Sequence, residues 1–420
     1  MHPNALLDLS AQLLERVLRF DAPADSLVSS FLRAHKELGQ RERHTLAETT
    51  YQVLRERLRY QHLAAGGAAP PFRRLAILGW QGAHYFLHSG MSDEERAWLE
   101  RARKAEAAGL PDKLRHNLPD WLSGQLLEQF GAEDFWPAVQ ALNRPAALDL
   151  RVNVLKAKRE AVQAALAELG ISAAPTPYSP WGLRLADKPA LQLLPAFKQG
   201  DFEVQDEGSQ LLALLLDARR GEMVVDFCAG AGGKTLAIGA AMRNTGRLYA
   251  FDTSGHRLAA LKPRLARSGL SNVYAVQIAH ERDDRIKRLA GKIDRVLIDA
   301  PCSGLGTLRR NPDLKWRQTP GSIVELPDKQ RAILASAARL LKPGGRLVYA
   351  TCSLLRAENE VIADEFTQAQ AGNFTVLPAA TALAEARVAQ PETLTEGAHL
   401  RLWPHRHATD GFFAAVWQRV

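Results

Sequence analysis

The chain has 420 residues, 46% of them hydrophobic, which at about 100–200 residues per domain allows two to four globular domains. Lys and Arg (54) exceed Asp and Glu (46), and the resulting net charge of +8 favours a polyanionic partner such as nucleic acid. Three cysteines, at 228, 302 and 352, are too few and too widely spaced for a disulfide framework or a compact zinc site. No apolar run is long enough for a signal peptide or a membrane span. We therefore expect a cytoplasmic monomer without metal.

Residues 1–142 have the pattern of an all-α domain. Near the N-terminus, leucine and valine recur at steps of three and four residues, as an amphipathic helix requires. A second charged helical stretch ends at the Gly-Gly-Ala-Ala-Pro-Pro break over 66–71, and no strand-like alternation occurs before Leu148. Residues 143–204 follow as a small α/β bridging module, with a strand over Leu148–Val154 and a helix over Lys158–Leu169.

From residue 205 to 420, short apolar runs alternate with helical segments. The expected strands are Met223–Phe227, Arg247–Asp252, Val273–Gln277, Asp294–Asp299, Arg346–Thr351 and Gly411–Trp417. The expected helices are 233–243, 255–268, 322–341 and 355–371. Such alternation predicts a Rossmann-like, doubly wound parallel sheet, whose ligands bind beyond the carboxyl ends of the strands.

A glycine-rich turn follows the first strand of this sheet. It reads Asp-Phe-Cys-Ala-Gly-Ala-Gly-Gly-Lys over 226–234, where glycines let the backbone approach a ligand and the next helix exposes its first amides. Asp252, at the end of the second strand, is placed to accept hydrogen bonds from ribose hydroxyls. The pair fits any adenosine-bearing cofactor, and a tight strand–helix turn without a ligand is the alternative.

Two cysteines follow neighbouring strands of the same sheet. Cys302 stands in Asp-Ala-Pro-Cys-Ser-Gly after the fourth strand, and Cys352 stands in Ala-Thr-Cys-Ser after the fifth. A single strand-end cysteine is usually a small core residue, but two of them at one cleft indicate chemistry. A thiolate that adds to carbon 6 of cytosine activates carbon 5 for methylation, and a second thiol could assist the later loss of the carbon 5 proton. Asp299 is an acid close enough in sequence to stabilise the ring nitrogen, with helix capping as its alternative role.

These motifs resemble those of the Nop/Sun family of RNA cytosine-5 methyltransferases over essentially the whole chain. The matching segments are 151–153, 204–207, 228–235, 299–304, 350–353 and 410–413. The resemblance implies a NusB-like RNA-binding domain at the N-terminus, S-adenosylmethionine as cofactor, and RNA, most simply small-subunit ribosomal RNA, as substrate. It makes Cys352 the nucleophile, Cys302 the residue that assists product release, and Asp299 a contact of the cytosine. DNA cytosine-5 methyltransferases instead attack from the Pro-Cys position.

The resemblance also implies which residues bind the cofactor. They are Cys228, Ala229, Gly230, Ala231, Gly232, Gly233, Lys234, Asp252, His280 and Asp299. Two positions depart from the family pattern: Ala231 replaces a proline, and His280 stands where an aspartate near the adenine is common, so that Glu281 or Asp283 could take over that contact.

The segment Leu308–Gln318 combines cations with one aromatic residue close to Cys302. We expect it to contact RNA, because cations with an interleaved aromatic suit phosphate tracking and base stacking. The residues concerned are Arg309, Arg310, Lys315 and Trp316. Arg55, Arg57, Arg59 and Tyr60 of the first domain could add phosphate contacts, or could simply form a solvated helix face.

Three other functions remain to be weighed against this one. A ribosomal RNA-binding assembly factor without activity would lack a cysteine or the glycine turn, and this chain has both. A small-molecule methyltransferase seldom needs a basic helical domain or paired thiols. A different RNA, such as tRNA, is the third alternative, and the sequence does not identify the nucleotide that is modified.

Overall fold

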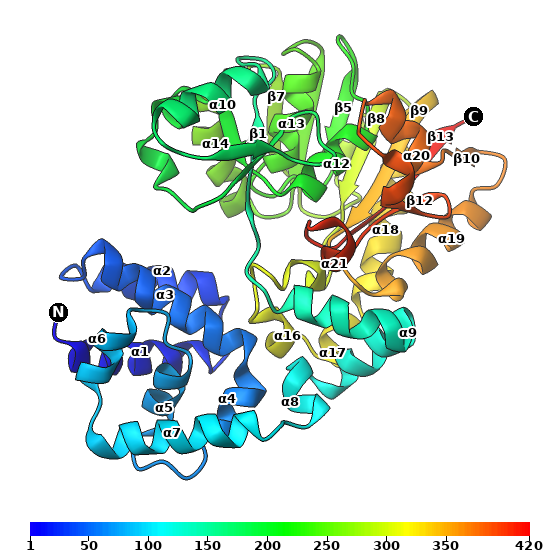
Figure 1. The fold of residues 1–420 in the computed structure, drawn as a ribbon. Coiled ribbons are helices and arrows are strands. Elements are labelled where there is room, and N and C mark those ends of the chain that lie inside the picture. Colours follow the sequence, from blue (N-terminus) through cyan, green and yellow to red (C-terminus); the bar gives the residue numbers. More distant parts are fainter. The chain divides into compact units, whose positions relative to one another are not determined.

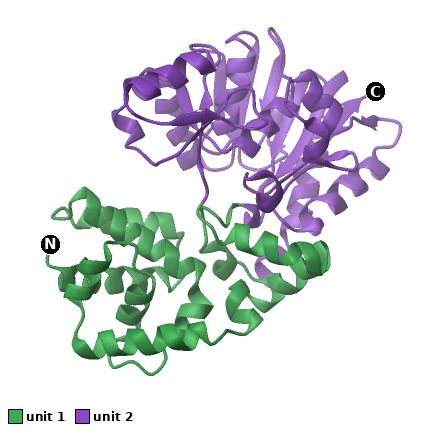
Figure 2. Cartoon of the chain, viewed as in Figure 1, with its two compact units in different colours: residues 1–145, 307–320 green, residues 146–306, 321–420 purple.

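The computed structural model describes residues 1–420, which divide into two compact units (Figure 2). Unit 1 comprises residues 1–145 and 307–320, and unit 2 comprises residues 146–306 and 321–420. The expected break after residue 142 lies close to the observed one, whereas no break follows residue 204. None of the helices combines the length and the apolar character that a membrane crossing requires.

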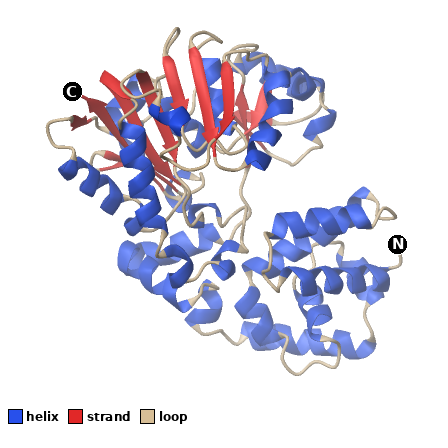
Figure 3. Cartoon of the chain, turned by 180° about the vertical axis from the view of Figure 1, so that it is seen from behind, coloured by secondary structure: helices blue, strands red, loops and turns tan.

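Unit 1 is built from helices alone, as the sequence predicts (Figure 3). Its helices are α1 (Pro3–Val17), α2 (Ala24–Ala34), α3 (Gln40–Arg55), α4 (Arg57–Leu63), α5 (Pro71–Leu78), α6 (His84–Gly90), α7 (Asp93–Ala107), α8 (Asp112–His116), α9 (Asp120–Leu142) and α16 (Leu314–Arg317). Leucines on one face of α1 belong to two apolar clusters, one shared with α5 and α7 and one shared with α2 and α3. Ser92 caps α7 together with Glu95, in the reciprocal pair of hydrogen bonds that fixes a helix N-terminus.

The first part of unit 2 is a four-stranded antiparallel sheet in the order β2-β3-β1-β4. Its elements are β1 (Leu148–Val152), α10 (Arg159–Glu168), β2 (Ala173–Pro175), β3 (Gly182–Leu185), η1 (Leu191–Leu193), α11 (Pro195–Gln199) and β4 (Phe202–Val204). The strand and the helix expected here agree with β1 and α10, each within two residues at either end.

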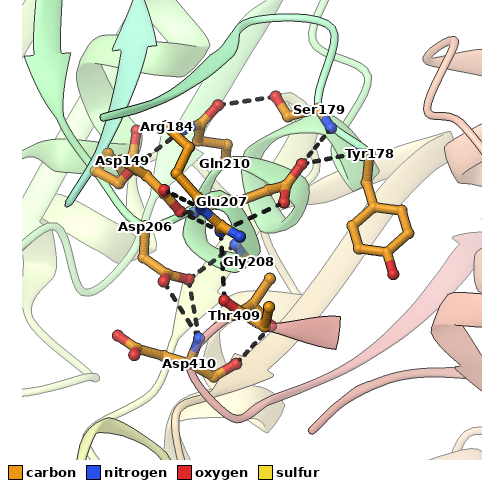
Figure 4. Close-up of polar contacts among 12 residues, drawn as sticks. Asp149, Tyr178, Ser179, Arg184, Asp206, Glu207, Gly208, Gln210, Thr409 and Asp410 are labelled. Atoms are coloured by element: carbon orange, nitrogen blue, oxygen red, sulfur yellow. Dashed lines mark hydrogen bonds and ion pairs between the residues drawn. The ribbon is translucent and has the colours of Figure 1, made fainter. Parts of the chain in front are cut away.

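A buried polar network joins this small sheet to helix α12 (Glu207–Leu215) (Figure 4). Asp149 on β1 pairs with Arg184 on β3 at 2.7 Å and accepts a hydrogen bond from the backbone amide of Glu207. The Glu207 carboxylate in turn accepts from the amides of Tyr178 and Ser179. Asp149, Ser179 and Glu207 are buried, and their hydrogen bonds connect the two sheets, which belong to one compact unit.

The large sheet has nine strands, and the five from β9 to the edge strand β7 are parallel. The strands are β5 (Met223–Asp226), β6 (Arg247–Asp252), β7 (Val273–Gln277), β8 (Ile293–Asp299), β9 (Leu341–Thr351), β10 (Phe374–Val376), β11 (Thr395–Glu396), β12 (His399–Leu402) and β13 (Phe412–Arg419). The order β11-β12-β13-β9-β8-β5-β6-β7, with β10 beside β13, confirms the Rossmann-like methyltransferase fold. The last predicted strand, however, runs antiparallel to β9 and also to β12, to which residues 403–411 with helix α21 connect it.

Helices cover both faces of this sheet (Figure 1). They are α12, α13 (Gly233–Ala241), α14 (Gly255–Ser268), α15 (Asp284–Lys287), α17 (Pro320–Ile323), α18 (Leu326–Ala338), η3 (Arg356–Glu358), α19 (Glu360–Ala369), α20 (Ala379–Glu385) and α21 (Pro404–His407), with the 3-10 turns η2 (Leu305–Thr307) and η4 (Pro391–Leu394). Val348 and Ala350 of β9 pack with α12, α13 and α20, whereas Leu347 and Tyr349 pack with α18 and α19. This alternation buries both faces and leaves the carboxyl ends of β5, β6, β8 and β9 for a site.

Candidate active site

The glycine turn after β5 requires glycine at Gly232. This residue has a φ of +81°, and a Cβ atom there would lie 2.1 Å from Cδ1 of Leu261 on α14. Gly230 also has a positive φ, of +56°, but a Cβ at this position would meet open space. The turn therefore uses Gly232 to pack α13 against α14 and leaves the backbone at Gly230 open to a ligand.

Two carboxylates hold the glycine turn and face the space beside it. Asp252 at the end of β6 accepts hydrogen bonds from the amide of Gly230 at 2.8 Å and from the amide of Ser254 at 2.7 Å. Asp226 is fully buried, accepts from the Thr235 hydroxyl at 2.6 Å, and keeps its second oxygen without a protein partner. Burial raises the pKa of Asp226 to about 7, against the lowering effect of Thr235.

A cavity of about 970 Å³ lies at the carboxyl ends of the parallel strands. Both strand-end cysteines and nearly all of the predicted cofactor residues line it. These are Cys228, Ala229, Gly230, Ala231, Gly233, Lys234, Asp252, His280, Asp299, Cys302 and Cys352. Gly232 is the predicted residue that does not, because it turns toward α14. The volume and the mixture of apolar walls with a few polar groups are typical of a cofactor site.

Several further residues, none of them predicted to bind the cofactor, also line this cavity. They are Val204, Gln205, Ser209, Thr253, Ser254, Arg257, Arg264, Ile278, Ala279, Lys329 and Ile333. Thr253 and Ser254 follow Asp252 directly, so their place after a strand end could have indicated them. Lys329 comes from α18 and carries no local sequence signal.

The two cysteine side chains face each other across neighbouring strand ends. Their sulfur atoms are 3.4 Å apart, because Asp299 on β8 and Ala350 on β9 are paired in register and each cysteine follows a few residues later. The amide of Gly306 also donates to the carbonyl oxygen of Cys352 at 2.8 Å, which joins the two loops through the backbone. Both thiols are only partly exposed.

The charges around the two thiols differ. Lys234 forms an ion pair with Asp299 at 2.7 Å, and although burial alone would lower the pKa of Lys234, the charges of Asp299 and Cys352 raise it. The pKa of Cys302 is raised well above its usual range by the hydrogen bond with Cys352, by burial and by the charges of Cys352 and Glu358. The structure thus places a cation near Cys352 and an anion near Cys302.

His280 lines the cavity, and its Nδ1 accepts a hydrogen bond from the amide of Arg282 at 3.1 Å. Glu281 is also in the wall, whereas Asp283 uses its carboxylate to accept from the amides of Ala279 and Arg285. Of the two substitutes considered for the adenine contact, Glu281 therefore faces the cavity and Asp283 caps the short helix α15.

The predicted RNA segment instead packs inside unit 1. Lys315 is 1% exposed, and its ammonium donates to the carbonyl oxygen of Arg55 at 2.8 Å and to Oδ1 of Asn143 at 2.7 Å. Burial lowers the pKa of Lys315 to about 7. The indole of Trp316 donates to the carbonyl oxygen of Leu54 at 2.7 Å. In this structure the Lys315 ammonium is used inside unit 1, whereas Trp316 is only partly buried and its contact with RNA stays a prediction.

The structure also shows where the other cations of the two surfaces predicted to contact RNA lie. Arg309 is 9% exposed and Arg310 is half-buried. Arg55 is buried, Arg57 lies 5.1 Å from the ring centre of Trp316, and Arg59 is paired with Glu56 and Glu106. The prediction of a phosphate-binding surface on α3 and α4 is therefore not supported by these arginines and Tyr60, which stabilise unit 1.

Comparisons with known proteins were made for the sequence and for the fold. Residues 213–418 match the family described as 16S rRNA methyltransferase RsmB/F, and residues 118–192 match its ferredoxin-like domain. The chain is 33% identical to the "Probable ribosomal RNA small subunit methyltransferase B" of Synechocystis over 97% of this chain and 98% of that protein. It is 39% identical to ribosomal RNA small subunit methyltransferase B of Sodalis glossinidius, over 59% of this chain and 56% of that protein.

Two solved structures support the same relationship. The crystal structure of PH0851 superposes with a TM-score of 0.79 and 26% identity over 99% of each chain. A methyltransferase homologue from Pyrococcus horikoshii superposes with a TM-score of 0.62 and 28% identity, over 73% of this chain and 97% of the other. The fold and the cavity at its strand ends are those of a methyltransferase. The chain belongs to the RsmB/F family of 16S rRNA methyltransferases.

The cofactor of this methyltransferase is S-adenosylmethionine, and the residues present fit it. Asp252 can accept further hydrogen bonds, since each carboxylate oxygen has two acceptor sites and only one of each is used. The buried oxygen of Asp226 without a protein partner marks the place of a donor from the ligand.

Proposed function

We propose that the enzyme methylates carbon 5 of a cytosine in small-subunit ribosomal RNA through a covalent adduct between Cys352 and carbon 6. The observation that carries this proposal is the pair of sulfur atoms 3.4 Å apart, at the carboxyl ends of β8 and β9, in the wall of the cofactor cavity. Carbon 5 of cytosine is a poor nucleophile, and addition of a thiolate at carbon 6 makes it an enamine carbon that can be methylated.

The electrostatics support Cys352 as the attacking thiol. The Lys234 ammonium interacts favourably with a charge on Cys352, and a thiolate needs such a cation. Cys302 has the opposite surroundings, since the negative charge of Glu358 and burial favour its protonated form. Cys352 is therefore the nucleophile, and Cys302 stands beside it as a neutral thiol during the attack.

Asp299 and Lys234 form the polar wall for the cytosine. When the carbon 6 position is attacked, negative charge moves into the ring toward nitrogen 3, and a proton or cation beside that nitrogen stabilises it. The Lys234–Asp299 pair lies in the same cavity wall as Cys352. We assign the cytosine contact to Asp299, and the Lys234 ammonium paired with this carboxylate supplies the positive charge beside the ring.

S-adenosylmethionine supplies the methyl group as an electrophile when it is bound. Once it has added to carbon 6, Cys352 is a neutral thioether, and its charge and its hydrogen bond as a thiol no longer raise the pKa of Cys302. Cys302 can then lose its proton to solvent and accept the proton of carbon 5. The electrons of that C–H bond re-form the double bond between carbons 5 and 6, and Cys352 leaves as a thiolate.

The substrate assignment rests on the relatives, which are named as small-subunit ribosomal RNA methyltransferases. We also expect naked or partly unfolded RNA to be preferred over the mature subunit, because the target base must leave its stack to reach the thiol. Bisulfite sequencing of small-subunit ribosomal RNA, before and after incubation with the purified enzyme, identifies the nucleotide. Methylation of tRNA alone, or of mature subunits faster than naked RNA, would contradict this assignment.

Replacement of each cysteine in turn by alanine tests the mechanism. Cys302→Ala is expected to attack and methylate but to stall, and so to accumulate a protein–RNA adduct that survives denaturing electrophoresis only when S-adenosylmethionine is supplied. Cys352→Ala is expected to form no adduct and no product. Adducts from Cys352→Ala alone would reverse the two roles, and no adduct from either variant would remove both cysteines from the mechanism.

A further inference from the structure

A buried carboxylate connects the loops that carry the two thiols. Glu358, at the end of η3, is 1% exposed. Its Oε2 accepts hydrogen bonds from the amide of Ser303 at 2.8 Å and from Nε2 of Gln330 at 3.0 Å. Its Oε1 accepts from the hydroxyl of Ser353 at 2.6 Å. Ser303 follows Cys302 directly and Ser353 follows Cys352 directly, so one side chain binds the residue after each thiol.

The two serine hydroxyls extend this connection. Their oxygens lie 3.0 Å apart, and since Ser353 donates its proton to Glu358, Ser303 donates to Ser353. Three donors converge on a group that only accepts when it is ionised, which favours a buried negative charge at this position. A hydrophobic or neutral side chain of the same size would leave several of these donors without partners.

The carboxylate accepts from the backbone amide of the residue after Cys302, but only from a side-chain hydroxyl of the residue after Cys352. The Glu358 charge contributes to the raised pKa of Cys302, whereas the Lys234 ammonium interacts with Cys352. The other titratable or charged side chains of the cavity wall are Asp226, Cys228, Asp252, Arg257, Arg264, His280, Glu281, Asp299 and Lys329, and Tyr349 lies on the strand behind Cys302. Two thiols 3.4 Å apart do not both ionise readily, because like charges at that separation repel, so the pair shares one proton in its reactive form.

We propose that Glu358 is a positioning residue that decides which of the two thiols becomes the nucleophile. Its carboxylate ties the two loops together and places a fixed negative charge on the Cys302 side. The proton that remains in the singly ionised pair therefore stays on Cys302, the other proton is released to solvent, and the thiolate forms on Cys352. This inference rests on the proposed function for its role in catalysis, but the state of the thiols can be measured without RNA.

The experiment compares Glu358→Gln with the wild-type chain and with Glu365→Gln as the matched control. Glu365 lies on α19, pairs with Arg331 and is far more exposed, so its substitution makes the same chemical change away from the thiols. Each resting protein is treated with iodoacetamide between about pH 6 and pH 9, and alkylation of Cys302 and Cys352 is quantified by mass spectrometry of the two peptides. We expect Cys352 to react first in the wild type and the control, and the Cys302 to Cys352 ratio to rise about tenfold in Glu358→Gln, the equivalent of about one pKa unit.

Methyl transfer supplies the second measurement. In Glu358→Gln, kcat is expected to fall about tenfold or more while the affinity for S-adenosylmethionine, measured by calorimetry, stays as in the control. An unchanged alkylation ratio in a folded Glu358→Gln protein overturns the proposal, whatever the activity. A changed ratio in an enzyme that proves not to methylate cytosine supports the proposal and refutes the proposed function instead.

Ser353→Ala is the second variant, which keeps the charge and removes one of its three donors. We expect alkylation of this variant to retain the preference for Cys352. The carboxylate keeps its negative charge when it loses one donor, so it disfavours a thiolate on Cys302 at least as strongly as before. A shift of alkylation toward Cys302 in this variant overturns the proposal, and this holds even if Glu358→Gln does not fold.

Discussion

Asp252 illustrates how one residue can serve both the fold and a ligand. Its carboxylate holds the glycine turn through Gly230 and the start of α14 through Ser254, and it still has acceptor sites toward the cavity. Asp252→Ala is expected to weaken S-adenosylmethionine binding by about 1–3 kcal/mol, the cost of unpaired hydroxyl and amide donors. Calorimetry measures this, with Asp284→Ala on the exposed α15 as control. Unchanged affinity would mean that the ribose is held elsewhere.

Titration of Asp226 makes the free energy of unfolding depend on pH, and the direction of this dependence follows from the raised pKa. Its pKa is about 7 in the folded chain against 3.8 as the reference, so between these values the folded chain holds a proton that the unfolded chain has lost. The free energy of unfolding therefore falls as the pH rises through this window and is not changed further by this group above it. The loss is at most about 4 kcal/mol, because the difference is about three pKa units.

Asp226→Asn removes this titration and is expected to flatten the pH dependence of stability between about pH 4 and pH 7. Urea unfolding of both proteins at several pH values provides the comparison. The amide oxygen can still accept from Thr235, so the fold should be kept. If the variant loses stability with rising pH as steeply as the wild type, another group is responsible.

At the scale of elements, the segment 308–318, which we expected to contact RNA, also makes contacts inside unit 1. Trp316 donates to the carbonyl of Leu54 and packs with the apolar cluster of α1, α2 and α3. Trp316→Ala is expected to destabilise unit 1 by about 2–4 kcal/mol, since a large, partly buried side chain is removed. Arg317→Ala is the control, because this side chain pairs only with Asp313 within one helical turn and should cost less than about 1 kcal/mol.

The measurement is the unfolding transition of unit 1 in the full chain, followed together with RNA affinity. Lower RNA affinity without loss of stability in Trp316→Ala would restore the first interpretation of this segment as an RNA contact.

The elements that could be predicted from the sequence are those whose pattern reflects burial. The apolar runs that became β5 to β9 and the helices between them were located within a few residues, except where helix ends differ, as at α18. Strand direction could not be predicted in the same way, because an apolar run does not indicate in which direction its strand runs. β13 proves to be antiparallel to both of its neighbours β9 and β12. The meeting of Cys302 and Cys352 was predictable, since parallel neighbouring strands end at one edge.

The residues whose role was misjudged from the sequence have one feature in common: their local pattern also occurs in other structural settings. Lys315 and Trp316 show the cation–aromatic pattern of a nucleic-acid contact, but backbone carbonyls accept the same hydrogen bonds as phosphates do. Glu358 was missed because a glutamate among charged neighbours resembles a surface residue. Its role becomes visible only in the three-dimensional structure, where three donors converge on its buried carboxylate.

At the scale of the whole molecule, the net charge of +8 predicts that RNA affinity depends on salt. Each phosphate contact releases counterions, so a few contacts with single-stranded RNA are enough to weaken binding about tenfold or more between about 50 and 200 mM salt. Filter binding with a small-subunit ribosomal RNA fragment measures the slope. Binding that does not change over this range would contradict a phosphate-based interface.

The position of 307–320 in unit 1 limits how such an enzyme can be shortened or recombined. The chain leaves the loop of Cys302 at Gly306, contributes Lys315 and Trp316 to the helical unit, and returns to the sheet after Pro320. In a catalytic fragment that begins near residue 146, Lys315 and Trp316 would lose their hydrogen-bond partners in residues 1–145. Chimaeras in which another RNA-binding domain replaces residues 1–145 would inherit the same defect, unless the loop after Cys302 is exchanged with it. We therefore expect the two units to be inherited together. We also expect the sequence of the segment 307–320 to change together with that of the helical domain.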